Sequence, residues 1–257
     1  MARKPLHASQ EARSILITGA AGGIGVALAQ AYAAPGVHLF LGDIQAAPLE
    51  NLTARCRARG AQAWARVVDV THREAMAAWI KEADHLFPLD LVILLAGISH
   101  GTMKQEETPE EIRSVFAVNL DGMLNTIEPV LPLFRQRGGG QIALMSSQAG
   151  CRGFPVAPSY CATKAAIRVY GEGLRARLLR ENIVVSVINP AFIKSPMTDA
   201  NPYHMPFRLS AERAAGIIKK GLAAKKARLC FPFPLVVGTY LLSLLPQSWV
   251  DRCLLLK

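Results

Sequence analysis

Short apolar runs alternate along the chain with longer segments of mixed polarity. Strands that are buried on both faces read as continuous apolar runs, and helices between them imply parallel crossovers. A run such as Ser14–Thr18, which ends in glycines, therefore predicts a buried strand followed by a tight turn. The same reading predicts strands at 37–42, 63–68, 89–95, 141–146 and 183–188, and helices at 23–34, 48–59, 73–85, 159–180 and from 109 onward.

This alternation predicts an α/β fold of three layers, in which a doubly wound parallel sheet (a Rossmann fold) lies between helices. No linker, repeat or low-complexity segment divides the chain, so residues 1–257 are expected to form one domain with an apolar C-terminal extension at about 229–257. Pro129 and Pro132 are expected to break or end the helix that begins at Pro109, because proline lacks the N–H that a helix interior needs.

A glycine-rich turn links the first expected strand to the first helix. Gly19, Gly23 and Gly25 stand there, with Ile24 between the last two. Glycine lets the backbone approach a pyrophosphate closely, and the helix N-terminus offers N–H groups to it. The turn therefore predicts a dinucleotide site.

Asp43 ends the second expected strand. A carboxylate at this place can accept hydrogen bonds from the adenosine ribose and would repel a 2′-phosphate. No Arg or Lys lies between Thr18 and Asp43 to bind that phosphate, so NAD is preferred and NADP stays possible. Capping of the following helix is an alternative role for Asp43, and it does not exclude the first.

The candidate chemistry lies at Tyr160 and Lys164, with Ser147 upstream. Residues four apart share one face of a helix, so the phenol and the ammonium can point into one cleft. A neighbouring positive charge favours the phenolate, which permits proton exchange with an alcohol near neutral pH. A nucleotide site and a proton-transfer pair together indicate redox chemistry at a carbonyl or hydroxyl.

Composition and charge argue against several classes of protein. The chain has 257 residues, 51% of them hydrophobic, and a net charge of +10. Its five cysteines include no Cys-x-x-Cys, which argues against a disulfide framework or a zinc site and favours a cytoplasmic location; no metal site is expected. The basic residues read as solvated helix faces or as contacts to an anionic substrate or membrane, and no nucleic-acid motif accompanies them.

Together these motifs resemble the short-chain dehydrogenase/reductase family between about Ser14 and Thr198. The resemblance rests on Thr18-Gly-Ala-Ala-Gly-Gly-Ile-Gly25, Asp69-Val70, Leu94-Leu-Ala-Gly97, Val-Asn119-Leu, Met-Ser-Ser147, Tyr160-Cys-Ala-Thr-Lys164 and Asn189-Pro-Ala-Phe-Ile-Lys-Ser195. It implies a catalytic tetrad of Asn119, Ser147, Tyr160 and Lys164. It also implies cofactor contacts from Gly19, Gly23, Ile24, Gly25, Asp43, Asp69, Val70, Ala96, Gly97, Tyr160, Lys164, Pro190, Ile193 and Ser195.

The resemblance also implies the roles. Tyr160 would act as general acid/base, Lys164 would lower the tyrosine pKa and hold the nicotinamide ribose, Ser147 would bind the substrate oxygen, and Asn119 would support a water beside Lys164. Two segments depart from the family pattern. Leu94 and Leu95 replace two asparagines, so lost hydrogen bonds must cost stability or be replaced by apolar packing. Ala191 replaces a glycine in the loop over the nicotinamide.

These features predict an NAD(P)-dependent oxidoreductase of a secondary alcohol or ketone that is expected to be hydrophobic. Alternatives are an NADP-dependent reductase of a lipid-like or acyl-carrier ketone, and a non-catalytic dinucleotide sensor. An apolar lid is expected at 192–209, including Met197, Tyr203 and Met205, with Cys151, Phe154 and Pro155 on the other side of the substrate pocket. By resemblance, the protein is expected to form a homodimer or homotetramer through the helices that hold Asn119 and Tyr160.

The stretch from Leu229 to Leu245 has no charged residue. Pro232 and Pro234 are expected to keep its first part from forming a regular helix, which leaves Leu235–Leu245, too short to cross a bilayer. Two interpretations remain: a strand and then a helix packed on the core or a partner subunit, or a helix that covers the substrate mouth or dips into a membrane surface.

Overall fold

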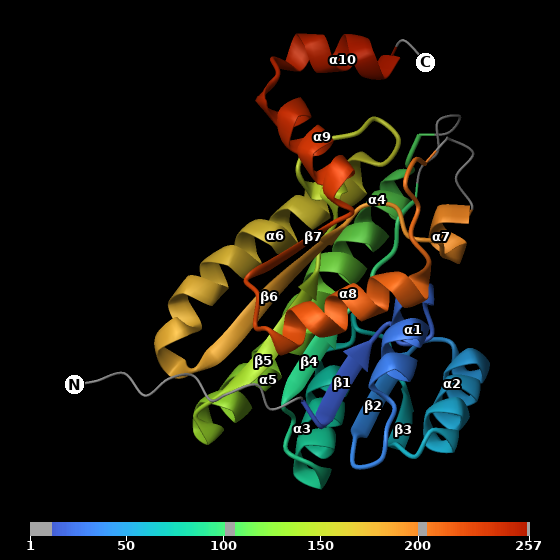
Figure 1. The fold of residues 1–257 in the computed structure, drawn as a ribbon, viewed down its shortest axis with the longest axis vertical. Helices are drawn as coiled ribbons and strands as arrows, with labels where there is room; N and C mark the ends of the chain where they lie inside the picture. Colours follow the sequence, from blue (N-terminus) through green and yellow to red (C-terminus); the bar gives the residue numbers. More distant parts are fainter. Residues whose placement is uncertain (1–11, 101–105, 200–204, 256–257) are drawn as a thin grey trace.

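Seven parallel strands form the sheet at the centre of the protein. The computed structural model describes residues 12–100, 106–199 and 205–255, and its strand order is β3-β2-β1-β4-β5-β6-β7 (Figure 1). The strands are β1 (Ser14–Thr18), β2 (His38–Asp43), β3 (Gln62–Val67), β4 (Leu91–Leu94), β5 (Gly140–Met145), β6 (Ile183–Pro190) and β7 (Arg228–Phe231). The order reverses between β1 and β4, and ligands bind at such a switch point in doubly wound sheets.

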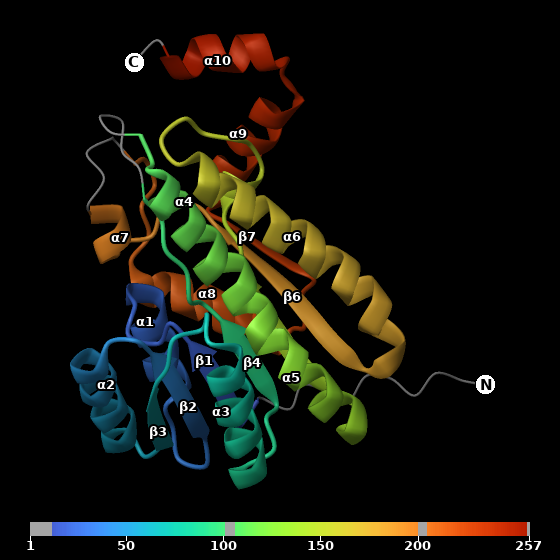
Figure 2. The ribbon, with the colours of Figure 1, turned by 180° about the vertical axis from the view of Figure 1, so that it is seen from behind.

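Helices cover both faces of the sheet (Figures 1 and 2). They are α1 (Gly23–Tyr32), α2 (Ala46–Ala58), α3 (Arg73–Leu86), α4 (Pro109–Phe116), α5 (Gly122–Arg137), α6 (Pro158–Leu178), α7 (Pro196–Asp199), α8 (Ala211–Ala223), α9 (Phe233–Leu244) and α10 (Gln247–Leu255). Ile15 and Ile17 of β1 pack into a core with α1, α2 and α8, while Leu16 points to a second core with α3, α5 and α6. The predicted three-layer fold is confirmed.

Helix α5 runs through both of its prolines, so the expectation of a break near Pro129 and Pro132 is wrong. Each internal proline removes one helical hydrogen bond and costs about 3 kcal/mol. Ile127, Val130 and Phe134 are fully buried on the same helix. Burial of each such side chain contributes about 1.5–3 kcal/mol, and together these contributions offset the cost.

A π-helix, η1 (Ala117–Asp121), connects α4 to α5. One turn of α-helix therefore holds an extra residue at the point where Asn119 turns toward the core. Asn119 is buried. Apolar periodicity alone does not predict such a widened turn.

The chain after β7 forms two further helices that rise above the carboxyl end of the sheet (Figure 1). Helix α9 begins at Phe233, with Pro234 in its first turn, where a missing N–H has no helical partner to lose. The expectation that Pro234 prevents a helix there is thus wrong. Among the described residues, none of the helices combines the length and apolar character that crossing a bilayer requires.

Candidate active site

A cleft of about 490 Å³ lies along the carboxyl ends of the strands. Its walls come from the turn after β1, the ends of β2 and β3, the segment after β4, and residues of β5, α6 and β6. Among the residues that line it are Gly19, Gly23, Ile24, Gly25, Asp43, Asp69, Val70, Ala96, Gly97, Ser147, Tyr160, Lys164, Pro190, Ile193 and Ser195. The structure thus brings every cofactor position suggested by the sequence into one cleft with the tyrosine, the lysine and the serine.

The turn after β1 has the shape that a pyrophosphate site needs. Gly19 has φ +66°, a conformation that favours glycine. A Cβ on Gly25 would lie 2.3 Å from the carbonyl oxygen of Gly19, so the start of α1 can approach the turn only without a side chain there. Helix α1 begins after Gly22, which offers no side chain to cap its first amides. An anionic group in the cleft fits this helix end.

Asp43 is nearly buried at the end of β2. Its Oδ2 accepts a hydrogen bond of 2.9 Å from the N–H of Ala21, and its Oδ1 accepts one of 3.0 Å from the N–H of Gln45. The carboxylate therefore fixes the glycine turn and its own turn while it borders the cleft. Asp69 behaves similarly at the end of β3, where its Oδ1 accepts hydrogen bonds from the N–H and the hydroxyl of Thr71.

Lys164 is buried beside Tyr160 on α6. Its Nζ lies 5.4 Å from the centre of the Tyr160 ring and donates a 2.9 Å hydrogen bond to the carbonyl oxygen of Met145. Burial lowers the pKa of Lys164 to about 8. A cation this close to the ring favours the phenolate over the phenol. The pair therefore has the placement that proton transfer near neutral pH requires.

Ser147 follows β5 and begins a 3₁₀ turn at Gln148–Gly150. Its Oγ accepts a 3.1 Å hydrogen bond from the N–H of Ala149 and donates a long one, 3.4 Å, to the carbonyl oxygen of Pro190. The hydroxyl therefore caps a turn and also borders the cleft. A substrate oxygen can compete for the weakly held proton without disturbing the cap.

Asn119 does not line the cleft; its side chain braces the cleft from behind. The Oδ1 atom accepts a 2.8 Å hydrogen bond from the N–H of Ile98, and Nδ2 lies 3.0 Å from both the Ile98 carbonyl and the Thr163 hydroxyl. One amide thus joins the segment after β4 to α6, next to Lys164. A Cβ on Gly97 would lie 3.1 Å from Asn119 Oδ1 and 3.3 Å from Lys164 Nζ, so the three residues meet.

The positions that depart from the family pattern are accommodated by packing. Leu94 is buried in the core under α3 and α5, and Leu95 packs against the opposite core. Apolar contacts thus replace the two asparagine side chains. The backbone N–H of Ala191 donates a 2.9 Å hydrogen bond to the carbonyl oxygen of Phe231, which ties this loop to the end of β7.

Three of the residues that were expected to border the substrate pocket do not line the cleft. Cys151, Phe154 and Pro155 line a separate hollow of about 700 Å³ between the loop before α6, the outer face of α6 and α10. In the expected lid, Met205 is buried. Tyr203 lies outside the described residues.

Two residues of the site were missed in the sequence. Thr198 lines the cleft, and its hydroxyl donates a 2.7 Å hydrogen bond to the Ile193 carbonyl. Gln148, next to Ser147, donates to the Asn189 carbonyl and accepts from Thr239 of α9. Neither belongs to a motif with a fixed spacing, although Thr198 stands at the end of the stretch that resembles the family.

Comparison with known proteins decides the family. The sequence model of the short chain dehydrogenases matches residues 13–205. The chain belongs to the short-chain dehydrogenase family. This family consists of oxidoreductases with a nucleotide-binding Rossmann fold.

Several short-chain dehydrogenases are similar to this one over most of their length. An uncharacterized oxidoreductase of Myxococcus xanthus is 33% identical over 241 residues, which cover 93% of this chain and 95% of the relative. A 3-oxoacyl-[acyl-carrier-protein] reductase of Thermotoga maritima is 30% identical, over 75% of this chain and 78% of the relative. The structure of a 3-oxoacyl-[acyl-carrier protein] reductase of Brucella melitensis with bound NAD superimposes with a TM-score of 0.73 at 28% identity, covering 90% of this chain and 95% of that one.

Proposed function

We propose that this short-chain dehydrogenase transfers a hydride between NAD and an apolar secondary alcohol or ketone. The observation that carries the proposal is the shared cleft, in which Tyr160, Lys164 and Ser147 lie at one end and the glycine turn and Asp43 at the other. The nicotinamide supplies or accepts the hydride when it is bound. The protein's own side chains bind the substrate oxygen and transfer the proton.

Tyr160 is the proton donor or acceptor at the substrate oxygen. Lys164, whose pKa burial lowers to about 8, stabilises the phenolate with its ammonium group. Ser147 gives up its long hydrogen bond to Pro190 and donates to the carbonyl or developing alkoxide instead. Asn119 positions Lys164 and Gly97 through α6 and the segment after β4, and supports a water beside the lysine.

The preference for NAD over NADP rests on charge. The carboxylate of Asp43 borders the cleft beside the glycine turn, where it would accept hydrogen bonds from ribose hydroxyls and repel a 2′-phosphate. Among the described residues that line the cleft, Lys164 is the sole cation, and it lies at the catalytic end. No arginine or lysine in that lining would therefore neutralise a 2′-phosphate near Asp43.

A second candidate is reduction of a lipid-like or acyl-carrier ketone with NADPH. Its substrate class is favoured by the two relatives named as 3-oxoacyl-[acyl-carrier-protein] reductases, although the Brucella melitensis structure holds NAD rather than NADP. A dinucleotide sensor is a weaker candidate, since a protein without turnover has no use for a lysine buried beside a tyrosine.

One experiment distinguishes the NAD-dependent enzyme, the NADPH-dependent reductase and the sensor. Turnover of a panel of alcohols, ketones and 3-oxoacyl thioesters is followed at the nicotinamide absorbance with NAD(H) and NADP(H) in parallel. Absence of turnover with every substrate would favour the sensor.

We further propose that the enzyme forms a homodimer or homotetramer in the cytoplasm. Helices α4, α5 and α6 lie side by side on one face (Figure 2), and this face exposes the apolar side chains of Ile112, Phe116, Val169 and Tyr170. The four cysteines whose side chains the structure describes have free thiols, as a reducing compartment permits. Light scattering at micromolar concentration tests the assembly; Val169→Glu should reduce the mass, and a monomeric wild type would contradict it.

A further inference from the structure

Helix α9 and the start of α10 expose an unusual number of large apolar side chains. Tyr240 is 64% exposed, Leu244 65% and Trp249 61%. The full set, called here the C-terminal apolar surface, comprises Phe233, Val237, Tyr240, Leu241, Leu244, Leu245 and Trp249. Counted from Phe233, the other members on α9 lie four, seven, eight and eleven residues further along, so they form one stripe along the helix.

The opposite side of α9 is held against the enzyme. The hydroxyl of Thr239 lies 2.7 Å from Gln148 Oε1, and Arg152 donates hydrogen bonds to the carbonyl oxygens of Ser243 and Leu245. Val250 of α10 is fully buried. Helix α9 is thus held by polar contacts on its inner side and presents apolar side chains outward, the reverse of an ordinary amphipathic surface helix, while α10 is anchored by the apolar Val250.

Charge distinguishes this surface from the face formed by α4, α5 and α6. That face carries an ion pair beside its apolar residues, between Arg73 of α3 and Glu128 of α5. From Leu229 to Val250 the chain has no charged residue at all. A protein interface away from its core is normally rimmed by polar and charged groups. The C-terminal apolar surface has none on α9, which favours contact with lipid over contact with a second copy.

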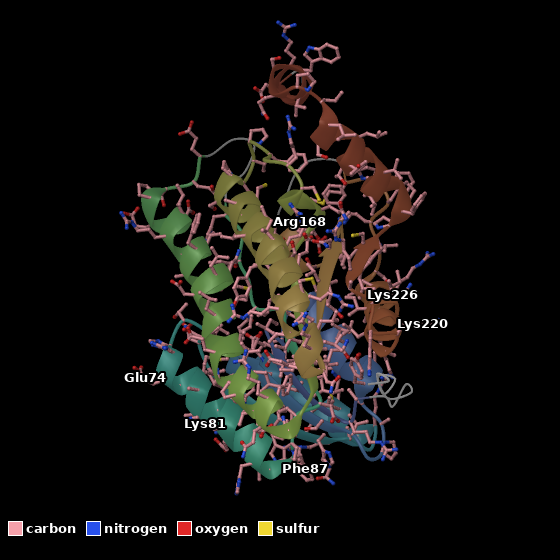
Figure 3. All side chains as sticks on the ribbon, turned by 90° about the vertical axis from the view of Figure 1, so that its left-hand side faces the viewer. Glu74, Lys81, Phe87, Arg168, Lys220 and Lys226 are labelled. Atoms are coloured by element: carbon pink, nitrogen blue, oxygen red, sulfur yellow. The ribbon has the colours of Figure 1, made fainter. Side chains whose placement is uncertain are left out.

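Basic residues flank the surface. Lys220 and Lys226 are exposed, and Lys226 is separated from the start of α9 by Ala227, the four residues of β7 and Pro232. Figure 3 shows both lysines on the side of the molecule from which α9 rises. At the far end Arg252 is exposed beside Asp251. Positive charge next to an apolar stripe that carries Tyr and Trp is the pattern of proteins that lie in the headgroup region of anionic bilayers.

From these observations we propose that the C-terminal apolar surface binds the face of an anionic lipid bilayer without crossing it. Helix α9 has 12 residues, too few to span the hydrocarbon core. The apolar side chains insert among the acyl chains near the headgroups, and Lys220 and Lys226 attract the lipid phosphates. The proposal goes beyond the proposed function, because it concerns the surface to which the enzyme binds. It does not depend on which alcohol or ketone the enzyme oxidises or reduces.

Flotation of the full-length protein with vesicles tests the proposal. The wild type should rise with vesicles of phosphatidylcholine and phosphatidylglycerol and should rise less with phosphatidylcholine alone or at high salt. Leu241→Glu, at a side chain that is 57% exposed, should lower the partition constant for the vesicles at least about tenfold, since one inserted leucine is worth roughly that factor. Leu86→Glu, at a 48% exposed leucine of α3, is the matched control and should float like the wild type.

The outcomes are distinguishable from one another. The thermal midpoint of each variant shows that it folds, and since both leucines are exposed, both variants should keep the midpoint of the wild type. Failure of the wild type to float, or equal flotation of Leu241→Glu and the wild type, would overturn the proposal. A drop in mass of Leu241→Glu by light scattering, without any flotation of the wild type, would assign the surface to a second copy of the chain. None of these readouts depends on turnover, so they stand apart from the proposed reaction.

Discussion

Thr239 of α9 and Gln148 of the turn after β5 are joined by a hydrogen bond of 2.7 Å between Oγ1 and Oε1. Gln148 directly follows Ser147, and its Nε2 also donates to the carbonyl oxygen of Asn189. Helix α9 is therefore connected to the turn that carries Ser147 through one buried amide. The Cys151 thiol, 3.7 Å away, is the other described donor to the same oxygen and a weak one.

Thr239→Val should consequently loosen the turn that carries Ser147. It removes the hydroxyl at constant shape and leaves the buried Gln148 oxygen with a weak donor, at a cost of about 1 kcal/mol in the free energy of unfolding. We expect kcat to fall severalfold while the Kd for NADH is unchanged. Ser243→Ala is the control, because the Ser243 hydroxyl donates within its own helix, to Tyr240. Equal kinetics of the two variants would show that Thr239 does not position the turn.

Tyr160→Phe removes the transferable proton and keeps the ring. General acid/base catalysis contributes about 10²–10⁴-fold, so kcat should fall by that factor while NADH binding, measured by its fluorescence, stays within about twofold. Tyr170→Phe is the matched control on the same helix, ten residues further along on an exposed part of α6. Near-normal turnover of Tyr160→Phe would exclude the tyrosine as the acid.

Asp43→Asn tests the choice of dinucleotide. It removes the negative charge near the adenosine ribose, so the ratio of the NADPH and NADH dissociation constants should fall by about tenfold. Because Asp43 also accepts hydrogen bonds from Ala21 and Gln45, a control must lose similar contacts elsewhere. Asp90→Asn meets this need, since Asp90 accepts from the N–H groups of Arg13 and Ser14 at the opposite end of the sheet. A wild type that binds NADPH more tightly than NADH would contradict the role of Asp43.

Burial of Lys164 predicts an unusual dependence of stability on pH. Its pKa falls from 10.5 to about 8 on folding, so between these values the unfolded chain binds more protons and stability rises with pH. Relative to Lys164→Met, the free energy of unfolding of the cofactor-free wild type should rise by about 2 kcal/mol between pH 7 and 9.5. Denaturant titrations measure the difference. The exposed Lys81, changed to Met, should show none.

Much of this architecture is encoded locally and was therefore predictable. Continuous apolar runs such as Ile15–Ile17 predict buried strands, and the glycines after β1 predict the turn because their conformation and close contacts tolerate no side chain. The spacing of Tyr160 and Lys164 predicts that both face one cleft because both lie on one helix.

The remainder depends on contacts between distant residues. Pro129 and Pro132 stay helical because of what the neighbouring side chains bury, which local propensity does not contain. Cys151 and Phe154 border a different hollow from the one expected because α10, almost a hundred residues later in sequence, closes over their loop. The Thr239–Gln148 contact likewise joins segments 91 positions apart.

The π-helix at Ala117–Asp121 sets the rotational phase between two halves of one long helical segment. Each residue turns an α-helix by about 100°, so the extra residue rotates α5 by that angle relative to α4. Asn119 can then point to Ile98 and Thr163 while Phe134, further along, points into the core. A chain shortened by one residue here would have to give up one of these two orientations. Single-residue deletions between α4 and α5 are thus expected to be far less tolerated than substitutions at the exposed Asp121.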